Sequence, residues 1–326
     1  MPTLRTVTVK SAGGDYTSIS AAEAGEQGDL VTLDRQLDIE CYASAAGDST
    51  QCTINGSTTD STRYIRVICP AGERHAGIWN AAKYHISVTT SGSPGGCITC
   101  SDDFTRIEYL QARNTRASPP DFNGAIYVDA VNCLVNACLG RDGFNSFDIG
   151  AGGNEIRNSI GYGGTNTGCK LTGAASGASF AYNGTFIGGT YGMSVDSTVN
   201  YAVAKNVYVH GTTFGFGPSA GGIVTKVNCT SSDTTATNNS GGGGATNCTD
   251  SIAHSTANFT NVTAGSEDYH IPTGSALKDD GVDLSGQFTI DIDGDTRGAT
   301  WDVGADEFVA AVGGGINMIH LNTVAA

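Results

Sequence analysis

Short apolar segments recur through the middle of the chain, and each carries an asparagine at the same place among its apolar and polar positions. The five asparagines lie 22, 25, 23 and 22 residues apart. They are Asn136, Asn158, Asn183, Asn206 and Asn228. Second apolar segments separated by glycine-rich breaks lie between them, at residues 125–128, 147–149, 169–171 and 193–195. A period of roughly 20 to 25 residues, built from short strands and turns without helical spacing, is typical of a solenoid.

A parallel β-helix gives the repeated asparagine a physical reason. Successive coils stack about 4.8 Å apart, so equivalent side chains form ladders along the stack. Asparagine tolerates a left-handed backbone at a sharp corner and can hydrogen-bond to the asparagine above and below it. We therefore predict that the five asparagines form one structural ladder. Chance spacing of a residue that is common in turns is the alternative interpretation.

Both ends of the repeat differ from its middle. Residues 7–9 indicate a strand, and residues 17–25 combine a capping hydroxyl, alanines and a final glycine, which predicts a short helix over the first coil. Further strands are expected at 30–33, 64–68 and 84–88. Near the end, residues 267–307 hold 11 acids against one lysine and one arginine, so −9 of the net charge of −15 lies there.

The amino-acid composition limits the possible folds and binding partners. Glycine makes up 46 of 326 residues and charged residues only 15%, which excludes long helical bundles and coiled coils. The negative balance excludes a cationic groove, so we predict no nucleic-acid partner. No run approaches the ~20 apolar residues of a membrane span, and the first residues lack an apolar run of signal-peptide length. Most of the ten cysteines are interpreted as buried thiols.

Several stretches resemble known proteins. The opening, Val-Thr-Val at 7–9 followed by Gly-Gly-Asp-Tyr-Thr-Ser-Ile at 13–19, looks like that of pectin-lyase-like right-handed β-helix proteins. Residues 291–297 and 302–308 resemble a closing segment of bacterial and phage β-helix proteins, and residues 64–67, 73–75 and 154–158 resemble such chains from tailed phages. The expected fold class is therefore all-β, a single-stranded right-handed parallel β-helix with a short N-terminal capping helix.

The expected organisation is one β-helix domain and a tail. The domain covers residues 1–308, with an N-terminal cap at about 1–30 and a C-terminal cap at about 264–308. Residues 309–326 carry no charge and would aggregate as a free strand, so we predict a docking tail that adds to its own coil edge or to another subunit. Packing back along its own solenoid is the alternative. The predicted assembly residues are Ile316, Met318, Ile319, Leu321 and Val324.

Acidic candidates for catalysis do not fall into a common register. Proton transfer to a glycosidic oxygen requires two carboxylates roughly 5 to 9.5 Å apart. Asp129, Asp148 and Glu155 lie at −7, −10 and −3 from the asparagine of their own coil, so their registers differ. No catalytic residue is predicted.

Metal and cofactor candidates are equally weak. Asp291, Asp293 and Asp295 alternate as in a calcium loop, but glycine stands fourth rather than sixth, and an aspartate replaces the glutamate at position twelve. A cap turn, in which these side chains bond backbone amides and pair with Arg297, is favoured. Cys97 and Cys100 form a lone C-x-x-C without the second pair that a zinc ribbon requires. We predict no metal and no cofactor.

The resemblance and the missing leader favour a structural role on the surface of a tailed-phage virion, as a head decoration protein, head fibre or tailspike. Such a protein assembles in the host cytoplasm and binds other virion subunits, with host surface polysaccharide as a candidate ligand and no membrane insertion. Because β-helix virion proteins are usually trimers, the resemblance also implies a homotrimer. The alternative function is a polysaccharide-degrading enzyme, a lyase or glycoside hydrolase of the same fold.

Overall fold

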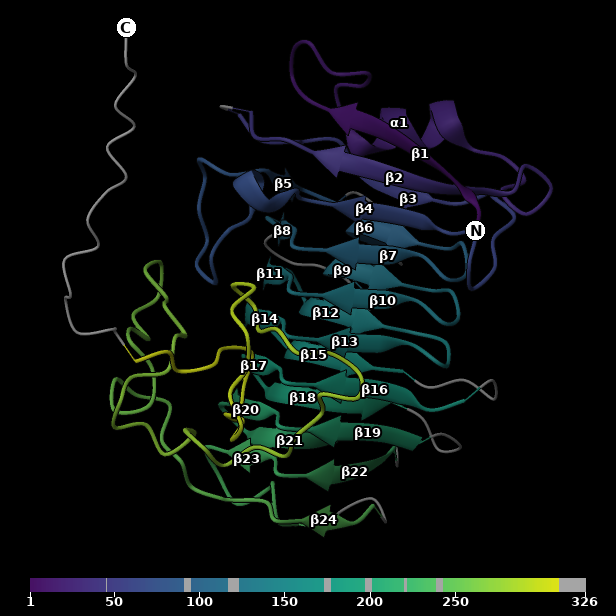
Figure 1. Ribbon diagram of the computed structural model, residues 1–326. Coiled ribbons are helices and arrows are strands. Elements are labelled where there is room, and N and C mark those ends of the chain that lie inside the picture. The colour runs from purple at the N-terminus through teal and green to yellow at the C-terminus, as the bar shows by residue number, and fades with distance from the viewer. Residues whose placement is uncertain are drawn as a thin grey trace, which may run out of the picture.

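Short parallel strands, stacked coil upon coil, make up most of the computed structural model (Figure 1). It describes residues 1–44, 46–90, 95–116, 123–172, 177–196, 201–219, 222–238 and 243–310. A regular coil contributes one strand to each of three sheets, and every strand pairs in parallel with its equivalents in the neighbouring coils. The chain is therefore a parallel β-solenoid.

The described strands fall into three sheets, which we number in the order that a coil visits them. Sheet 1 contains β1 (Thr3–Val9), β2 (Arg35–Cys41), β4 (Ile65–Ile68), β7 (Arg106–Glu108), β10 (Leu134–Asn136), β13 (Glu155–Arg157), β16 (Ser179–Tyr182), β19 (Tyr201–Lys205), β22 (Ile223–Val227) and β24 (Ala245–Thr246). Sheet 2 contains β5 (His85–Val88), β8 (Gln111–Asn114), β11 (Leu139–Asp142), β14 (Ile160–Gly164), β17 (Thr185–Gly188), β20 (Tyr208–Gly211) and β23 (Thr230–Ser231). Sheet 3 contains β3 (Cys52–Ile54), β6 (Gly95–Cys100), β9 (Asn123–Val128), β12 (Asn145–Ile149), β15 (Thr167–Leu171), β18 (Tyr191–Asp196) and β21 (Phe214–Ser219).

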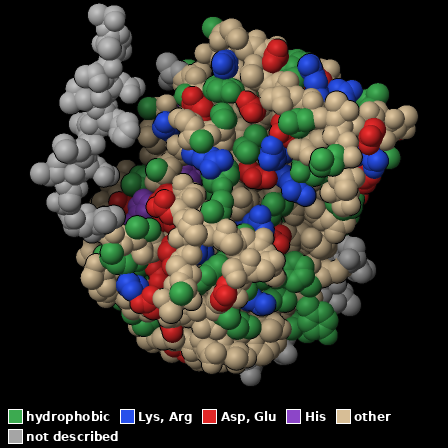
Figure 2. Space-filling view, in the orientation of Figure 1, with side chains coloured by type: hydrophobic (Ala, Val, Ile, Leu, Met, Phe, Trp, Pro, Cys, Tyr) green, Lys and Arg blue, Asp and Glu red, His purple; other side chains and the backbone are tan. Residues whose placement is uncertain are grey.

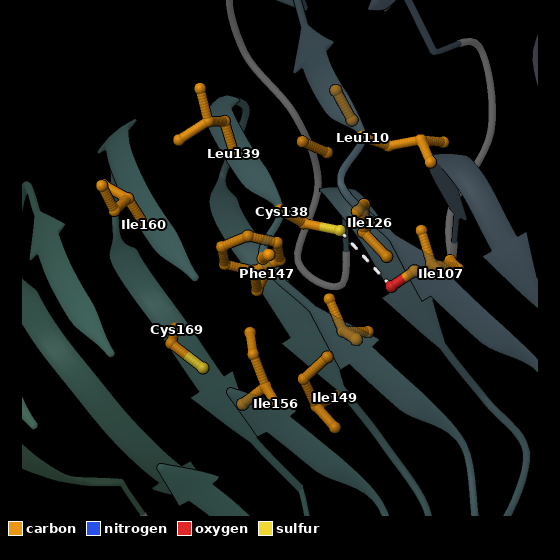
Figure 3. Close-up of a cluster of buried hydrophobic side chains, with 14 of the residues drawn as sticks. Ile107, Leu110, Ile126, Cys138, Leu139, Phe147, Ile149, Ile156, Ile160 and Cys169 are labelled. Carbon is orange, nitrogen blue, oxygen red and sulfur yellow. Dashed lines mark hydrogen bonds between the residues drawn. The ribbon is translucent and has the colours of Figure 1, made fainter. Parts of the chain in front are cut away.

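The core is the interior of the coils, where apolar side chains from all three sheets meet (Figure 3). Phe147 of β12 is fully buried and lies between coils. A Cβ atom on Gly140 or Gly161 would approach its ring to within 2.8 or 2.9 Å, so the two glycines leave the space that the ring fills. Cys138 adds a thiol that donates to the carbonyl oxygen of Ile107 at 3.5 Å. Cysteine here is a core residue.

One helix, α1 (Ile19–Glu26), lies beside β1 at the N-terminal end of the stack (Figure 1). The Ser18 hydroxyl accepts a hydrogen bond from the backbone N–H of Ala21 at 3.1 Å and caps it. The predicted fold class, an all-β parallel β-helix with a short N-terminal helix, is thereby confirmed. The predicted glycine stop is wrong: Gly25 lies inside the helix, where a Cβ would come within 2.5 Å of the Tyr16 hydroxyl.

The strand expected at 7–9 is part of β1, and of the three further strands expected in the first coils, two are present and one is not. Strands β4 and β5 occupy the segments expected at 64–68 and 84–88. Residues 30–33 form a turn instead of the expected strand. The Asp29 carboxylate accepts from the backbone N–H of Thr32 at 2.9 Å and from its hydroxyl at 2.7 Å, which closes the chain into that turn. A short 3-10 helix, η1 (Ala71–Glu73), follows β4.

Residues 250–308, which we call the C-terminal arm, add no strand to the three sheets in the part of the chain that the structure describes. They turn back and run along the outside of the coils (Figure 1). Acidic side chains gather at the lower left of the same view, where the arm lies (Figure 2). None of the helices in the described ranges has the length and apolar character needed to span a membrane.

Candidate functional site

The predicted asparagines lie at the corner between sheets 1 and 2. Four of the five adopt a left-handed backbone with φ between 46° and 54°, namely Asn158, Asn183, Asn206 and Asn228. Asn136 is instead the last paired residue of β10, and Ala137, with φ 51°, takes the corner position in that coil. The corner thus selects asparagine in most coils because asparagine tolerates this backbone.

The asparagine side chains make two hydrogen bonds along the stack. Asn158 donates to the Asn136 side chain at 3.3 Å, and Asn206 donates to Asn183 at 3.2 Å. Between these pairs the side-chain oxygen of Asn158 faces the arm, where it accepts a hydrogen bond from the Arg297 guanidinium at 3.2 Å. Contacts along the stack therefore alternate with contacts to the arm.

Further hydrogen bonds of these side chains hold the C-terminal arm. Asn206 donates to the Val282 carbonyl at 2.8 Å and accepts from the Val282 N–H at 2.7 Å. Asn228 donates to the Asp280 carbonyl at 2.8 Å, and Asn183 to the Asp302 carbonyl at 3.4 Å. The asparagine corner is thus the surface on which the arm docks.

Arg297 anchors the arm from within. Its side chain is fully buried and donates to the Glu307 carboxylate at 3.1 Å and to the Ala305 carbonyl at 2.8 Å. Its guanidinium also lies 5.2 Å from the centre of the Trp301 ring. A buried charge of this kind is stable only while its partners stay in place, so Arg297 couples the arm's own fold to its docking.

The three alternating aspartates do not converge on one point. Asp291 is buried, and its carboxylate accepts from the backbone N–H groups of Asp293 and Asp295, each at 2.9 Å, and of Glu307 at 3.1 Å. Burial raises the pKa of Asp291 to about 6, with the Asp293 charge adding to the effect. Asp293 instead contacts His270, and Asp295 is exposed. The loop is a turn closed by a carboxylate, and its side chains do not form a common ligand shell.

Among the described residues, His270, Asp293 and Asp306 bring possible metal-ligand atoms to within 4.8 Å of one another. His270 contacts Asp268 through Nδ1 at 2.5 Å and Asp293 through Nε2 at 2.8 Å. Burial opposes a charge on His270, but these two carboxylates raise its pKa to about 11. Burial also raises the pKa of Asp306 to about 8. As an imidazolium, His270 donates through both nitrogens, so the cluster is held by ion pairs, although the second carboxylate oxygen of Asp293, Oδ1, is buried without a hydrogen-bond partner.

The acids considered for catalysis lie on two sheets. Asp148 is buried on β12 of sheet 3, where it accepts from the Asn145 side chain at 3.0 Å. Glu155 lies on β13 of sheet 1 and pairs with Arg157 at 3.0 Å, while Asp129 is exposed after β9. Asp129 and Asp148 lie in neighbouring coils and, after burial, both raise the pKa of Tyr127, whereas Glu155 lies on a different sheet. The predicted assembly residues Ile316, Met318, Ile319, Leu321 and Val324 lie outside the described residues.

A hollow that the sequence did not predict lies over the outer face of sheet 2, and we call it the sheet 2 groove. Arg113, Arg141 and Tyr162 occupy equivalent positions on β8, β11 and β14, so they form an outward row across the coils. The loop before β5 and the arm stand beside this row. Between them lies a cavity of about 530 Å³. Its lining residues are Ile78, Trp79, Arg141, Thr260, Asn261, Gly265, Ser266, Glu267 and Asp268.

Two further hollows continue the groove along the stack. A cavity of about 380 Å³ shares Glu267 with the first and is also lined by Tyr162, His254 and Tyr269. A third of about 240 Å³, which includes Arg113, shares lining glycine and threonine residues with the second. Three adjoining cavities offer an extended ligand several places to bind.

Aromatic rings surround the Arg141 guanidinium on the floor of the first two hollows. The Arg141 guanidinium lies 5.9 Å from the centre of the Trp79 ring and 5.4 Å from that of Tyr162. Tyr162 packs edge-on against Tyr269 of the arm at 5.7 Å, and burial raises the pKa of both phenols, so they stay neutral. Glu267 and Asp268 add acceptors at the rim. The groove thus combines flat apolar surfaces with charged hydrogen-bonding groups.

Comparison with known proteins identifies no family. The chain matches no protein-family model, and no curated protein shows significant sequence similarity to it. The sequence gives little indication of the sheet 2 groove. Trp79, Arg141 and Glu267 are separated by 62 and 126 residues, so they follow no period. One hint was available: the chain has only two tryptophans, and Trp79 lies in a loop between strands.

Proposed function

We propose that the chain is a structural protein of a tailed-phage virion surface and binds a host surface polysaccharide through the sheet 2 groove. The single observation that carries the proposal is the placing of Trp79, Arg141 and Glu267 around one elongated hollow. The C–H face of a sugar ring is apolar and packs on an aromatic ring, while its hydroxyls donate to carboxylates and accept from a guanidinium. An elongated groove suits a repeating polymer.

The structural half of the proposal is supported by the solenoid and by the sequence resemblance. Stacked coils with an apolar interior form a stiff rod that can present a groove away from a particle. The likeness of residues 5–308 to phage β-helix chains favours a virion location and a homotrimer. Mass spectrometry of purified particles and light scattering of the isolated protein test these two points. A protein absent from particles and monomeric at high micromolar concentration would contradict them.

Glycan binding is tested by titration calorimetry with capsular and O-antigen polysaccharides of candidate hosts. Trp79→Ala should weaken binding at least about tenfold, which corresponds to about 1.4 kcal/mol, because it removes the stacking surface. Tyr201→Ala is the matched control, since Tyr201 is 61% exposed and does not line the groove. Equal affinity of wild type and both variants would contradict a role for the groove.

A polysaccharide-degrading enzyme is the second candidate, because Glu267 and Asp268 both line the groove and supply two carboxyl groups. Release of reducing ends from a bound polysaccharide would favour it. In that case Glu267→Gln should abolish release while weakening binding less than Trp79→Ala does, because the amide oxygen still accepts a hydrogen bond. Binding without release by the wild type would favour the structural function.

The tail provides a separate test of assembly. Deleting residues 313–326 should leave the melting of the coils unchanged, because the described coils close without these residues. The same deletion should abolish incorporation into particles or association of subunits. Assembly of the shortened chain at the wild-type level would show that the tail is not the assembly segment.

A further inference from the structure

Two cysteines face each other across the last two coils. Val227 of β22 pairs with Thr246 of β24, and Thr230 forms a parallel bridge with Thr249, so Cys229 lies opposite Cys248. Each follows an asparagine in the left-handed conformation, with φ 49° at residue 228 and 51° at residue 247. Neighbouring strands are about 4.8 Å apart, which lies within the Cα separation of roughly 4.4 to 6.8 Å that a disulfide spans.

The two thiols differ in exposure and in acidity. Cys229 is buried, whereas Cys248 alone among the ten cysteines is partly exposed. The interaction between the two thiols lowers the pKa of Cys248 from its usual range, although burial opposes this shift. Burial, and then the same interaction, raises the pKa of Cys229. Cys248 is therefore the more accessible and the more acidic thiol, and Cys229 lies next to it as a second thiol.

We propose that Cys229 and Cys248 form a disulfide that ties the last coil to the one before it when the protein meets a small oxidising disulfide such as glutathione disulfide. The Cys248 thiolate attacks one sulfur of glutathione disulfide, forming a mixed disulfide and releasing a glutathione thiolate. The Cys229 thiol gives its proton to that thiolate, and its sulfur then attacks the Cys248 sulfur and displaces the second glutathione. The protein dithiol loses two electrons, and the glutathione disulfide gains them.

The position of this pair gives the disulfide a physical consequence. Strand β24 has only two residues, and no described strand pairs with its outer edge, so backbone pairing holds the last coil from one side only. A covalent link at its corner limits fraying of that edge. The inference is independent of the proposed glycan binding, because neither cysteine lines the sheet 2 groove.

A second stacked pair serves as an internal control. Glu40 of β2 pairs with Ile68 of β4, so the residues that follow, Cys41 and Cys69, also lie in neighbouring coils. Both are fully buried in the core, and burial holds the pKa of each thiol well above its usual range. Glutathione disulfide should not reach them in the folded protein.

The test treats the reduced, folded full-length protein with glutathione disulfide, followed by alkylation in denaturant and peptide mapping. The wild type should lose two alkylatable thiols, yield a linked pair of peptides containing Cys229 and Cys248, and exchange amide hydrogens more slowly at 243–249. Cys229→Ser should stop at one glutathione adduct on Cys248, Cys248→Ser should not react, and Cys41→Ser should behave as wild type. Ten free thiols, a stable adduct on Cys248 in the wild type, or a link between other cysteines would overturn the proposal. The wild-type result decides the matter even where a variant fails to fold.

Discussion

The coils and the C-terminal arm of the same chain both bury apolar side chains, such as Phe259 and Leu277 of the arm, but they differ in their polar contacts. In the coils, in-register backbone pairing surrounds a continuous apolar interior, as at Val135, Ile156 and Ala181 in consecutive turns. In the arm, side chains bond to backbone groups and buried charges pair, as at Asp291 and Arg297. The coils therefore repeat the same strand pairing and packing in each turn, whereas each contact of the arm occurs once. A change in the coils should spread through neighbouring turns, and a change in the arm should release the arm alone.

The largest effect is expected in the coil interior. Phe147→Ala should cost ~3–5 kcal/mol, because it empties a cavity between Gly140 and Gly161 that those residues cannot refill. Chemical denaturation followed by circular dichroism measures the loss. Phe214→Ala is the control, since Phe214 is 39% exposed. Equal losses in the two variants would show that the interior is not the main source of stability.

Removal of the arm's anchor should act locally. Arg297→Ala leaves Glu307 buried without its cation and should cost about 3 kcal/mol, at the lower end for a broken buried pair because water can reach the released arm. Hydrogen exchange should accelerate in residues 264–308 and stay slow in residues 123–172. Arg63→Ala, which breaks exposed ion pairs, should change neither region. Simultaneous acceleration in arm and coils would contradict the separation of the two regions.

The contact between the two regions is tested at the asparagine corner. Asn206→Leu should cost ~1–3 kcal/mol, because it removes both side-chain bonds to Val282 and leaves their partners unpaired. Asn247→Leu shares the left-handed backbone but lies exposed, so it should show only the backbone cost of about 1 kcal/mol. Protease sensitivity of the arm separates the two results. An equal cost in both variants would mean that the Asn206 bonds to the arm contribute little.

The same contrast explains what the sequence could predict. The coils repeat, so the period of the asparagines located the corners, and only four of the five have the left-handed backbone because Ala137 replaces asparagine in one coil. The docking of the arm on those corners is not marked by any repeated pattern in the sequence. The bond between Asn206 and Val282 spans 76 residues, and nothing in either local sequence specifies the other.

The sheet 2 groove was missed for a related reason. Its row on the coils is arginine at 113 and 141 and tyrosine at 162, a pattern too short to distinguish it in the sequence from ordinary outward positions. Its other wall depends on where an irregular arm lies, which tertiary contacts decide. The aspartates of the arm were interpreted as turn-forming from sequence, and the Asp291 carboxylate does bond the backbone there. The pairing of Asp293 with His270 depends on two separate loops meeting.

The smallest expected effect is a pH dependence where the arm meets sheet 2. The rings of His210, on β20, and His254, in the arm, stack at 4.4 Å. Burial, and then the His210 charge, lower the pKa of His254 to about 4, and burial also lowers that of His210. Unfolded histidine binds its proton near pH 6.5, so between about pH 6.5 and 4 the unfolded state holds more protons, and stability falls as the pH falls through this window. The loss at pH 5 should not exceed about 1–2 kcal/mol.

The variant His254→Phe isolates the contribution of His254 to the pH dependence of stability. It keeps a flat ring against His210 and Phe259 but removes one of the two titrating groups. Denaturation curves at pH 7 and pH 5 should differ less for the variant than for the wild type. The comparison must be made between proteins, because Asp233 next to His210 and buried carboxyls elsewhere in the arm also titrate as the pH changes. An identical pH dependence in both proteins would show that the histidine stack is not what makes the contact between arm and coils sensitive to acid.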